Sequence, residues 1–262
     1  MITEISLALS GGGMRGCAHI GVLRRLEELD LVPKWISGTS IGSIIGVLSA
    51  DGYTSEEISE IFIKSKFGFD INFLSITEAF LSSKRIENIL KKTLRSKTFD
   101  QLKTPFYACV TDYFTGCPEY VCQGPVIPAV MASSAIPLFY APVKLNDRLY
   151  VDGGVSRNLP TAPLREKALP IIGVHVNPLS PARKKNMSQK IDHSMHLLLL
   201  EKTIEASKDC HIYIEPEKLN TYSIFETKFI TKLIEIGYQK AKHCLTPELM
   251  LGLTGDGFKP RV

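Results

Sequence analysis

The chain has 262 residues, of which 44% are hydrophobic and 22% are charged. These proportions are close to the averages of globular proteins, and they exclude a disordered chain, a collagen-like repeat and a coiled coil. Lys and Arg number 31 and Asp and Glu number 27, a formal net charge of +4. This excess is too small to indicate a nucleic-acid-binding protein, which concentrates basic residues in a stripe.

Six cysteines are scattered along the chain without a Cys-x-x-Cys pair, and the first residues lack the positive and apolar regions of a secretory signal. We therefore expect a reduced, cytoplasmic protein. The longest apolar run, Ile41 to Ala50, is interrupted by glycines and serines and is shorter than the ~18 residues needed to cross a bilayer. Any contact with a membrane is expected to be peripheral.

The first fifty residues alternate between strand and helix patterns. We predict a strand at 5–10, a glycine loop at 11–16, an amphipathic helix at 17–30, a strand at 32–37, a tight turn at 38–42 and a helix at 41–50. Two successive units of strand, glycine turn and helix predict a largely parallel α/β sheet.

Further elements follow to the C-terminal end. Helices are predicted at 54–66, 84–96, 126–135, 189–207 and 228–244, and strands at 105–112, 120–122, 148–151, 171–176 and 211–214. No internal repeat or long linker divides the chain. We expect one domain over residues 1–262.

A Gly-x-Ser-x-Gly pentapeptide, Gly38–Gly42, falls between a predicted strand and a predicted helix, as a nucleophile elbow requires. The small residues on each side of Ser40 allow the sharp turn that projects its hydroxyl. A helix that begins directly after Ser40 aims its N–H groups and positive dipole end at an oxyanion formed there. The alternative is a glycine-rich turn in which Ser40 only caps the helix.

The run Gly11–Gly16 also lies between a strand and a helix, and it fits the Gly-x-Gly-x-x-Gly pattern of dinucleotide-binding loops. Such loops need an acidic residue about 20 positions further on, where this sequence has Trp35 to Gly38. A P-loop is excluded because Cys17 and Ala18 follow Gly16. The run is therefore either an anion hole of backbone N–H groups or a tight turn.

A third motif, Asp152-Gly153-Gly154, ends a predicted strand. Asp-Gly is a common turn dipeptide, so a plain turn is the simplest interpretation. The functional interpretation depends on Ser40, because a serine nucleophile needs a base and a carboxylate at a strand end can supply one.

In this order, Gly11–Gly16, Gly38–Gly42 and Asp152–Gly154 resemble the three signatures of the patatin-like phospholipases. The segment Ala132-Ser133-Ser134-Ala135-Ile136-Pro137 resembles another segment often found between the second and third signatures. The resemblance covers about residues 5–176, and residues 180–262, expected to be helical, have no motif support. It implies a three-layer α/β/α sandwich around a largely parallel sheet.

The resemblance also implies a serine lipid acyl hydrolase, that is, a phospholipase A or lysophospholipase-like esterase that forms an acyl-enzyme. Ser40 is then the nucleophile, Asp152 the general base, and the glycine-loop amides form the oxyanion hole. The residues assigned to the hole are Gly11, Gly12 and Gly13, and those assigned to motif support are Arg15, Gly16, Gly38, Gly42, Gly153 and Gly154. Arg15 occupies the basic position of the glycine motif, where it either touches substrate or braces the loop.

Three alternatives stay open. A histidine triad would recruit one of the histidines after Asp152, in the Ser–Asp–His order of α/β-hydrolases; these are His175, His193, His196, His211 and His243. The same serine could pass the acyl group to an alcohol or thiol, although related acyltransferases usually carry His where this chain has Thr39. A catalytically silent lipid-binding module is the third.

The expected partner is a lipid or acyl-ester substrate, and neither nucleic acid, cofactor nor metal is expected, since metal-ligand motifs are missing. The aromatic segment Phe67–Phe80 is either a wall of the acyl pocket or ordinary core. The basic stretches Lys84–Lys97 and Arg183–Lys185 either favour anionic headgroups or form a solvated face. Headgroup, chain length and oligomeric state are not predicted.

Overall fold

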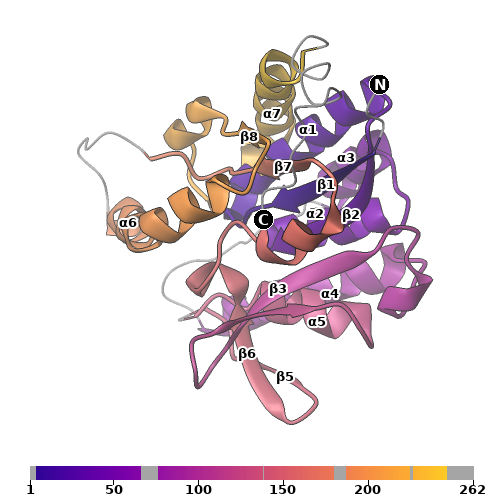
Figure 1. Cartoon of the computed structure of the whole chain (residues 1–262). Coiled ribbons are helices and arrows are strands. Elements are labelled where there is room, and N and C mark those ends of the chain that lie inside the picture. The colour runs from indigo at the N-terminus through magenta and orange to yellow at the C-terminus, as the bar shows by residue number, and fades with distance from the viewer. Residues whose placement is uncertain (1–3, 66–75, 138, 180–186, 225–226, 247–262) are drawn as a thin grey trace.

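A mixed sheet of eight strands forms the centre of the computed structural model, which describes residues 4–65, 76–137, 139–179, 187–224 and 227–246 (Figure 1). The strand order is β5-β6-β3-β2-β1-β7-β8, and β4 pairs with β3 beside this path. The strands are β1 Glu4–Leu9, β2 Val32–Thr39, β3 Phe106–Asp112, β4 Pro118–Val121, β5 Val143–Leu145, β6 Arg148–Asp152, β7 Ile171–Val174 and β8 Ile212–Ile214.

Five strands, β3-β2-β1-β7-β8, are parallel, and β4, β5 and β6 add antiparallel pairs at one side. The carboxyl ends of the parallel strands therefore share one edge of the sheet, where α/β proteins usually bind ligands. The parallel part was predicted from the strand–turn–helix units. Strand β5 was not predicted, because three residues are too few to show a periodic pattern.

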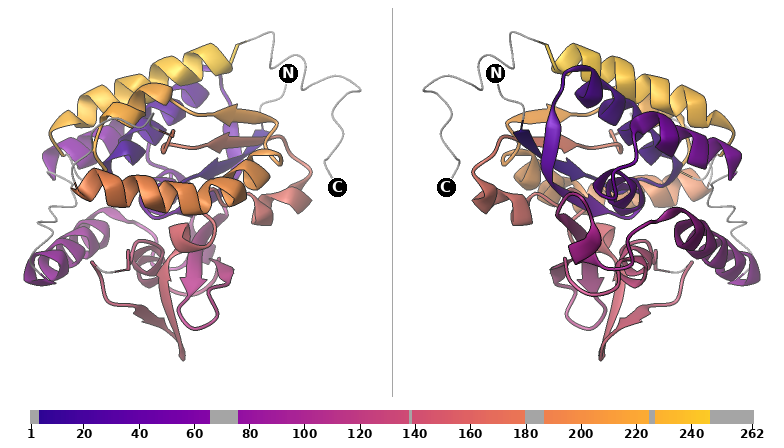
Figure 2. Two further views of the ribbon diagram at one scale, coloured as in Figure 1. Left: turned by 90° about the vertical axis from the view of Figure 1, so that its left-hand side faces the viewer. Right: turned by 90° about the vertical axis from the view of Figure 1, so that its right-hand side faces the viewer.

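Helices cover both faces of the sheet (Figure 2). The α-helices are α1 Cys17–Glu28, α2 Ile41–Ala50, α3 Ser55–Lys64, α4 Ile76–Thr93, α5 Val126–Ser133, α6 Met187–Ser207 and α7 Ile230–Cys244. Short 3₁₀ turns are η1 Gly13–Gly16, η2 Phe99–Gln101, η3 Gly153–Val155, η4 Ala162–Lys167, η5 Glu217–Thr221 and η6 Thr227–Phe229. The arrangement confirms the predicted three-layer α/β/α sandwich.

Successive side chains of β1 point to opposite faces of the sheet and belong to two separate layers of the core. Ile5, Leu7 and Leu9 are fully buried in the main cluster, together with side chains of α1, α2 and α7. Ala8 points to the other face, where it packs with Leu159 and residues of η4 and α6. Each fully buried Ile or Leu contributes about 1.5–3 kcal/mol. The central strand is therefore fixed from both sides.

Helix boundaries follow local chemistry at the start of α3. Thr54 accepts a hydrogen bond from the Glu57 amide, and the Glu57 side chain accepts one from the Thr54 amide, which forms a capping box. The prediction of a helix start at this point is confirmed. The predicted basic helix at 84–96 begins earlier, at Ile76.

Two sequence expectations lie outside the described part of the chain. Most of Phe67–Phe80 and all of Arg183–Lys185 are not described, so their roles stay predictions. Among the helices that the structure describes, none has the length and apolar character needed to cross a membrane.

Candidate active site

Ser40 occupies a sharp turn between β2 and α2, with φ 53° and ψ −124°. A residue with a side chain rarely adopts this conformation, which costs of the order of 1–3 kcal/mol. The glycines of the pentapeptide permit it: a Cβ on Gly38 would lie 2.4 Å from the Gly42 carbonyl oxygen, and one on Gly42 would lie 2.4 Å from the Leu9 carbonyl oxygen. The strand and the helix thus approach too closely for any larger residue.

The amide of Ser40 is held by Ser133, the last residue of α5, which also bonds to the neighbouring strand β3. The Ser40 N–H donates to Ser133 Oγ at 3.1 Å, and Ser133 Oγ donates to the Cys109 carbonyl of β3 at 2.6 Å. Ser133 is fully buried. The segment 132–137 was singled out by resemblance, but this role of Ser133 was not predicted, because it depends on how α5 packs.

Asp152 lies at the end of β6, where it pairs with Val110 of β3. Its amide donates to the Ala135 carbonyl at 3.0 Å, and its carboxylate accepts the Gly154 N–H at 2.7 Å. Ser40 and Asp152 are both buried, with 4% and 5% of their surface exposed. The Ser40 side chain hydrogen-bonds the Asp152 carboxyl group, so the structure brings together the two residues that the sequence proposed as nucleophile and base.

Burial raises the pKa of Asp152 to about 6, because a carboxylate loses its hydration there. Hydrogen bonds from the Ser40 side chain and the Gly154 amide partly oppose this rise, since they stabilise the ionised form. Burial also raises the pKa of the nearby Cys109 thiol, to about 12. At neutral pH the site therefore holds an ionised aspartate and an inert thiol.

The glycine loop after β1 lies beside Ser40, since a Cβ on Gly11 would be 3.2 Å from the Ser40 Cβ. The Gly11 N–H donates to the Asn158 carbonyl at 3.3 Å, and its carbonyl accepts from the Asn177 side chain at 2.7 Å. Gly11 is therefore engaged in holding the loop. No described residue accepts a hydrogen bond from the amides of Gly12 or Gly13, which leaves these two N–H groups for an anion.

The supporting residues of the motifs have structural partners. Arg15 is buried and its Nε donates to the Tyr222 carbonyl at 2.8 Å, so it ties the glycine loop to the residue that follows η5. Gly16 packs against Ile41, where a Cβ would lie 2.3 Å from the nearest side-chain atom. A Cβ on Gly153 would lie 2.3 Å from the Cys109 carbonyl oxygen.

No histidine whose side chain the structure describes hydrogen-bonds Ser40 or Asp152, so a histidine triad is not formed among these residues. His19 is fully buried against the Ser10 carbonyl, and burial lowers its pKa to about 4. His211 accepts the Ile171 amide, and His175 pairs with Glu215. His193 and His243 share no hydrogen-bond partner with the dyad in the described part of the chain, and the side chain of His196 lies outside it.

No cluster of three or more potential metal-ligating side chains occurs in the described ranges. All six cysteines are free thiols. The site consists of a serine, an aspartate and backbone N–H groups, which are sufficient for acyl transfer.

Comparisons with known proteins find a matching family and related chains. Residues 7–165 match the family model described as patatin-like phospholipase. An uncharacterized NTE family protein of Mycobacterium tuberculosis is 35% identical over 165 residues, which cover 62% of this chain and 45% of that protein. Patatin-like phospholipase domain-containing protein 6 of Homo sapiens is 30% identical over 166 residues, which cover 60% of this chain and 12% of that protein.

The chain thus spans less than half the length of these curated relatives. Among solved structures, VipD from Legionella pneumophila superposes with a TM-score of 0.56 at 12% identity. The alignment covers 92% of this chain and 66% of that one, and it supports the same fold.

Proposed function

The chain belongs to the patatin-like phospholipase family, and we propose that it hydrolyses lipid acyl esters with a dyad of Ser40 and Asp152. The observation that carries this proposal is the buried serine–aspartate pair beside the Gly12 and Gly13 amides. The family names a lipid substrate class, and the dyad supplies the chemistry.

In the first step, the Asp152 carboxylate accepts the Ser40 hydroxyl proton while Oγ forms a bond to the ester carbonyl carbon. The carbonyl electron pair moves to its oxygen, and the amides of Gly12 and Gly13 stabilise the resulting oxyanion. Each such donor contributes about 3 kcal/mol. The tetrahedral intermediate then expels the alcohol, which takes the proton from Asp152, and an acyl-enzyme remains.

In the second step, water attacks the acyl-enzyme and gives a proton to Asp152. The intermediate collapses, Ser40 Oγ recovers this proton, and the fatty acid leaves. The mechanism needs no third residue, because Asp152 alternates between base and acid.

The basicity of Asp152 is critical for this mechanism. A carboxyl group with an ordinary pKa near 3.9 is a weak base for a serine hydroxyl. Burial raises the pKa of Asp152 to about 6, which brings it about 2 units closer to the pKa of the serine hydroxyl. This difference corresponds to about 3 kcal/mol. Burial therefore supports both the base and the later acid role.

The test combines activity with labelling. We expect 4-nitrophenyl esters and phospholipids to be hydrolysed by the wild type and not by Ser40→Ala, and a fluorophosphonate ester to label only the wild type. A Ser40→Ala protein that retains turnover would refute the proposal. Transfer of the acyl group to an added alcohol, in preference to water, would instead favour the acyltransferase, and failure to label would favour a silent lipid-binding module.

A further inference from the structure

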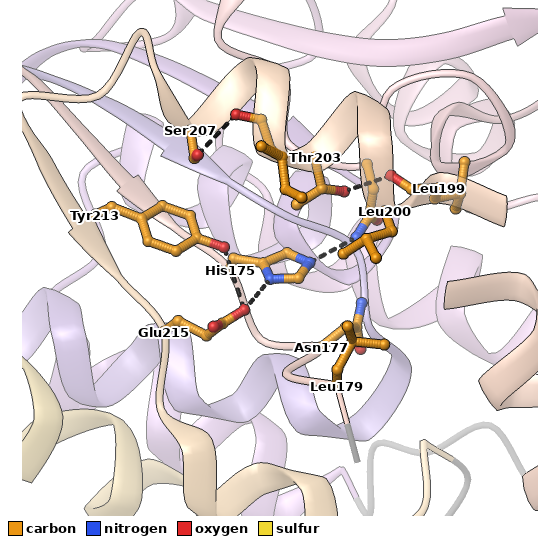
Figure 3. A pocket seen from close by; sticks show the side chains of 11 residues that line it. His175, Asn177, Leu179, Leu199, Leu200, Thr203, Ser207, Tyr213 and Glu215 are labelled. Atoms are coloured by element: carbon orange, nitrogen blue, oxygen red, sulfur yellow. Dashed lines mark hydrogen bonds and ion pairs between the residues drawn. The ribbon is translucent and has the colours of Figure 1, made fainter. Parts of the chain in front are cut away.

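A cavity of about 200 Å³ lies at the carboxyl ends of β7 and β8 and is covered by α6 (Figure 3). It is lined by Asn158, His175, Asn177, Leu179, Leu199, Leu200, Thr203, Ile204, Ser207, Tyr213 and Glu215. None of these residues belongs to the dyad or to the three signatures. The mechanism described above therefore does not explain what the cavity is for.

The wall of the cavity is shared with the candidate active site. Asn158 Oδ1 lies 2.7 Å from the position of a Cβ on Gly11 and 3.4 Å from that of a Cβ on Gly154. Gly11 contacts Ser40, and Gly154 contacts Asp152, because a Cβ on Gly154 would lie 3.0 Å from Asp152 Oδ1. The cavity and the dyad thus occupy neighbouring positions along the same carboxyl edge of the sheet, where extended ligands bind.

Buried polar groups form the floor of the cavity. His175 Nδ1 and Glu215 Oε1 are 2.8 Å apart, the Tyr213 hydroxyl donates to the same oxygen at 3.2 Å, and Asn158 Nδ2 lies 3.4 Å from His175 Nε2. Asn177 is 95% buried, and its Oδ1 has no hydrogen-bond partner among the described residues. A buried acceptor without a partner costs about 1–3 kcal/mol, which a ligand hydroxyl would recover.

Charge selects against an anionic ligand. Burial alone would raise the pKa of Glu215, but the hydrogen bond and charge of His175 and the hydrogen bond of Tyr213 lower it below its ordinary value, so the carboxylate is ionised. His175 is the one described lining residue that can carry a positive charge, and it is already paired with Glu215, so the described lining offers no further cation to balance a phosphate or a carboxylate. A neutral ligand with donors and acceptors fits this floor.

The rim of the cavity is apolar. Leu179 and Ile204 line it and are 41% and 51% exposed, and Leu199 and Leu200 of α6 complete this side. At about 30 Å³ per water-sized group, the volume holds about seven such groups, the size of a short polyol. A polar floor under an apolar rim suits a hydroxylated carbon skeleton.

We propose that this cavity binds the neutral, hydroxyl-bearing alcohol portion of the ester, as in a monoacylglycerol. The inference rests on the proposed function, since it assigns the leaving-group side of the same site. The ligand hydroxyls donate to the side-chain oxygens of Asn177 and Asn158, and the ester carbonyl reaches Ser40 across Gly11. Glu215 disfavours esters with a phosphate in this position.

Three esters with the same acyl chain test the assignment: monodecanoylglycerol, decanoyl lysophosphatidate and 4-nitrophenyl decanoate. We expect the wild type to favour monodecanoylglycerol over the lysophosphatidate at least tenfold in kcat/KM. Ser207→Phe fills the cavity, and it should lower the ratio of kcat/KM for monodecanoylglycerol to that for the nitrophenyl ester at least tenfold. Ser194→Phe, the same change at an exposed position of α6 outside the lining, should leave this ratio within twofold.

A charge variant gives a second readout that does not depend on cavity filling. Glu215→Gln keeps an acceptor for His175 and Tyr213 but removes the negative charge, so the relative kcat/KM for lysophosphatidate should rise at least fivefold. A wild-type preference for lysophosphatidate, or ratios unchanged in both Ser207→Phe and Glu215→Gln, would overturn the inference.

Binding separates the two proposals. The ether 1-O-decylglycerol cannot be hydrolysed, and calorimetry should show that Ser40→Ala protein binds it at least tenfold more tightly than Ser40→Ala/Ser207→Phe protein. Cavity-dependent binding without ester turnover would refute the hydrolase and keep the alcohol site. Turnover that is lost in Ser40→Ala, without cavity-dependent binding, would refute the alcohol site alone.

Discussion

Replacement of Asp152 by asparagine should stabilise the protein while it removes activity. The pKa of Asp152 is raised from 3.8 to about 6 in the folded protein because burial disfavours its charge. Between these two values the folded state binds more protons than the unfolded state, so the free energy of unfolding falls as the pH rises through this window. Above about pH 6 the full cost applies, about 3 kcal/mol for about 2 units.

Asparagine has the shape of aspartate but does not ionise, and its Oδ1 can still accept the Gly154 N–H. Asp152→Asn should therefore exceed the wild type in free energy of unfolding by about 1–3 kcal/mol at pH 8, and by much less at pH 4. Urea denaturation followed by circular dichroism at both pH values measures this difference. Asp147→Asn is the matched control, because the Asp147 side chain is fully exposed and should change stability by less than about 0.5 kcal/mol.

Activity should change in the opposite direction. If Asp152 is the base, kcat/KM of the wild type rises with pH and reaches half of its plateau near pH 6, because only the ionised form accepts the serine proton. Asp152→Asn should lose at least about 10³-fold and this pH dependence with it. A variant that is no more stable than the wild type at pH 8, or that keeps near-normal turnover, would refute the reasoning.

Other predictions concern the residues that hold the elbow. Ser133→Ala removes the acceptor of the Ser40 amide and the donor to Cys109, so unfolding should cost about 1–3 kcal/mol less and kcat should fall about tenfold; an unchanged kcat would contradict the positioning role. Gly42→Ala places a Cβ 2.4 Å from the Leu9 carbonyl oxygen and should destabilise by more than about 3 kcal/mol in thermal unfolding. Gly116→Ala, which meets nothing within 4 Å but has φ +69°, should cost only about 1 kcal/mol.

The sequence predicts the parallel part of the fold because glycine turns and apolar periodicity are local signals. Strands β1 and β2 and the helices after them have nearly the predicted bounds. Two features were beyond local reasoning. Strands β4 and β6 were predicted, but the antiparallel pairing of β6 with β3 joins segments that are distant in the sequence, and Ser133 reaches Ser40 only because α5 packs against the sheet. Neither signal exists within a short window of sequence.

His175 illustrates how a small boundary difference changes an interpretation. The pattern predicts a strand through residues 171–176, which would place His175 within the sheet. In the structure β7 ends at Val174, so His175 lies at the carboxyl edge and pairs with Glu215, which follows β8. Strand ends are the least regular part of a pattern, and they are also where parallel sheets place their functional groups.

One short segment links the two halves of the candidate dyad. Ser133 accepts the Ser40 amide, and two residues later the Ala135 carbonyl accepts the Asp152 amide. Both bonds join the segment to backbone groups rather than to the reacting atoms, so it fixes where the two residues stand without competing for the hydroxyl or the carboxylate. The strained turn at Ser40 and the buried charge at Asp152 each cost stability, and these bonds help to offset that cost where it arises. Residues 133–135, at the end of α5, are therefore as much a part of the site as the signatures themselves.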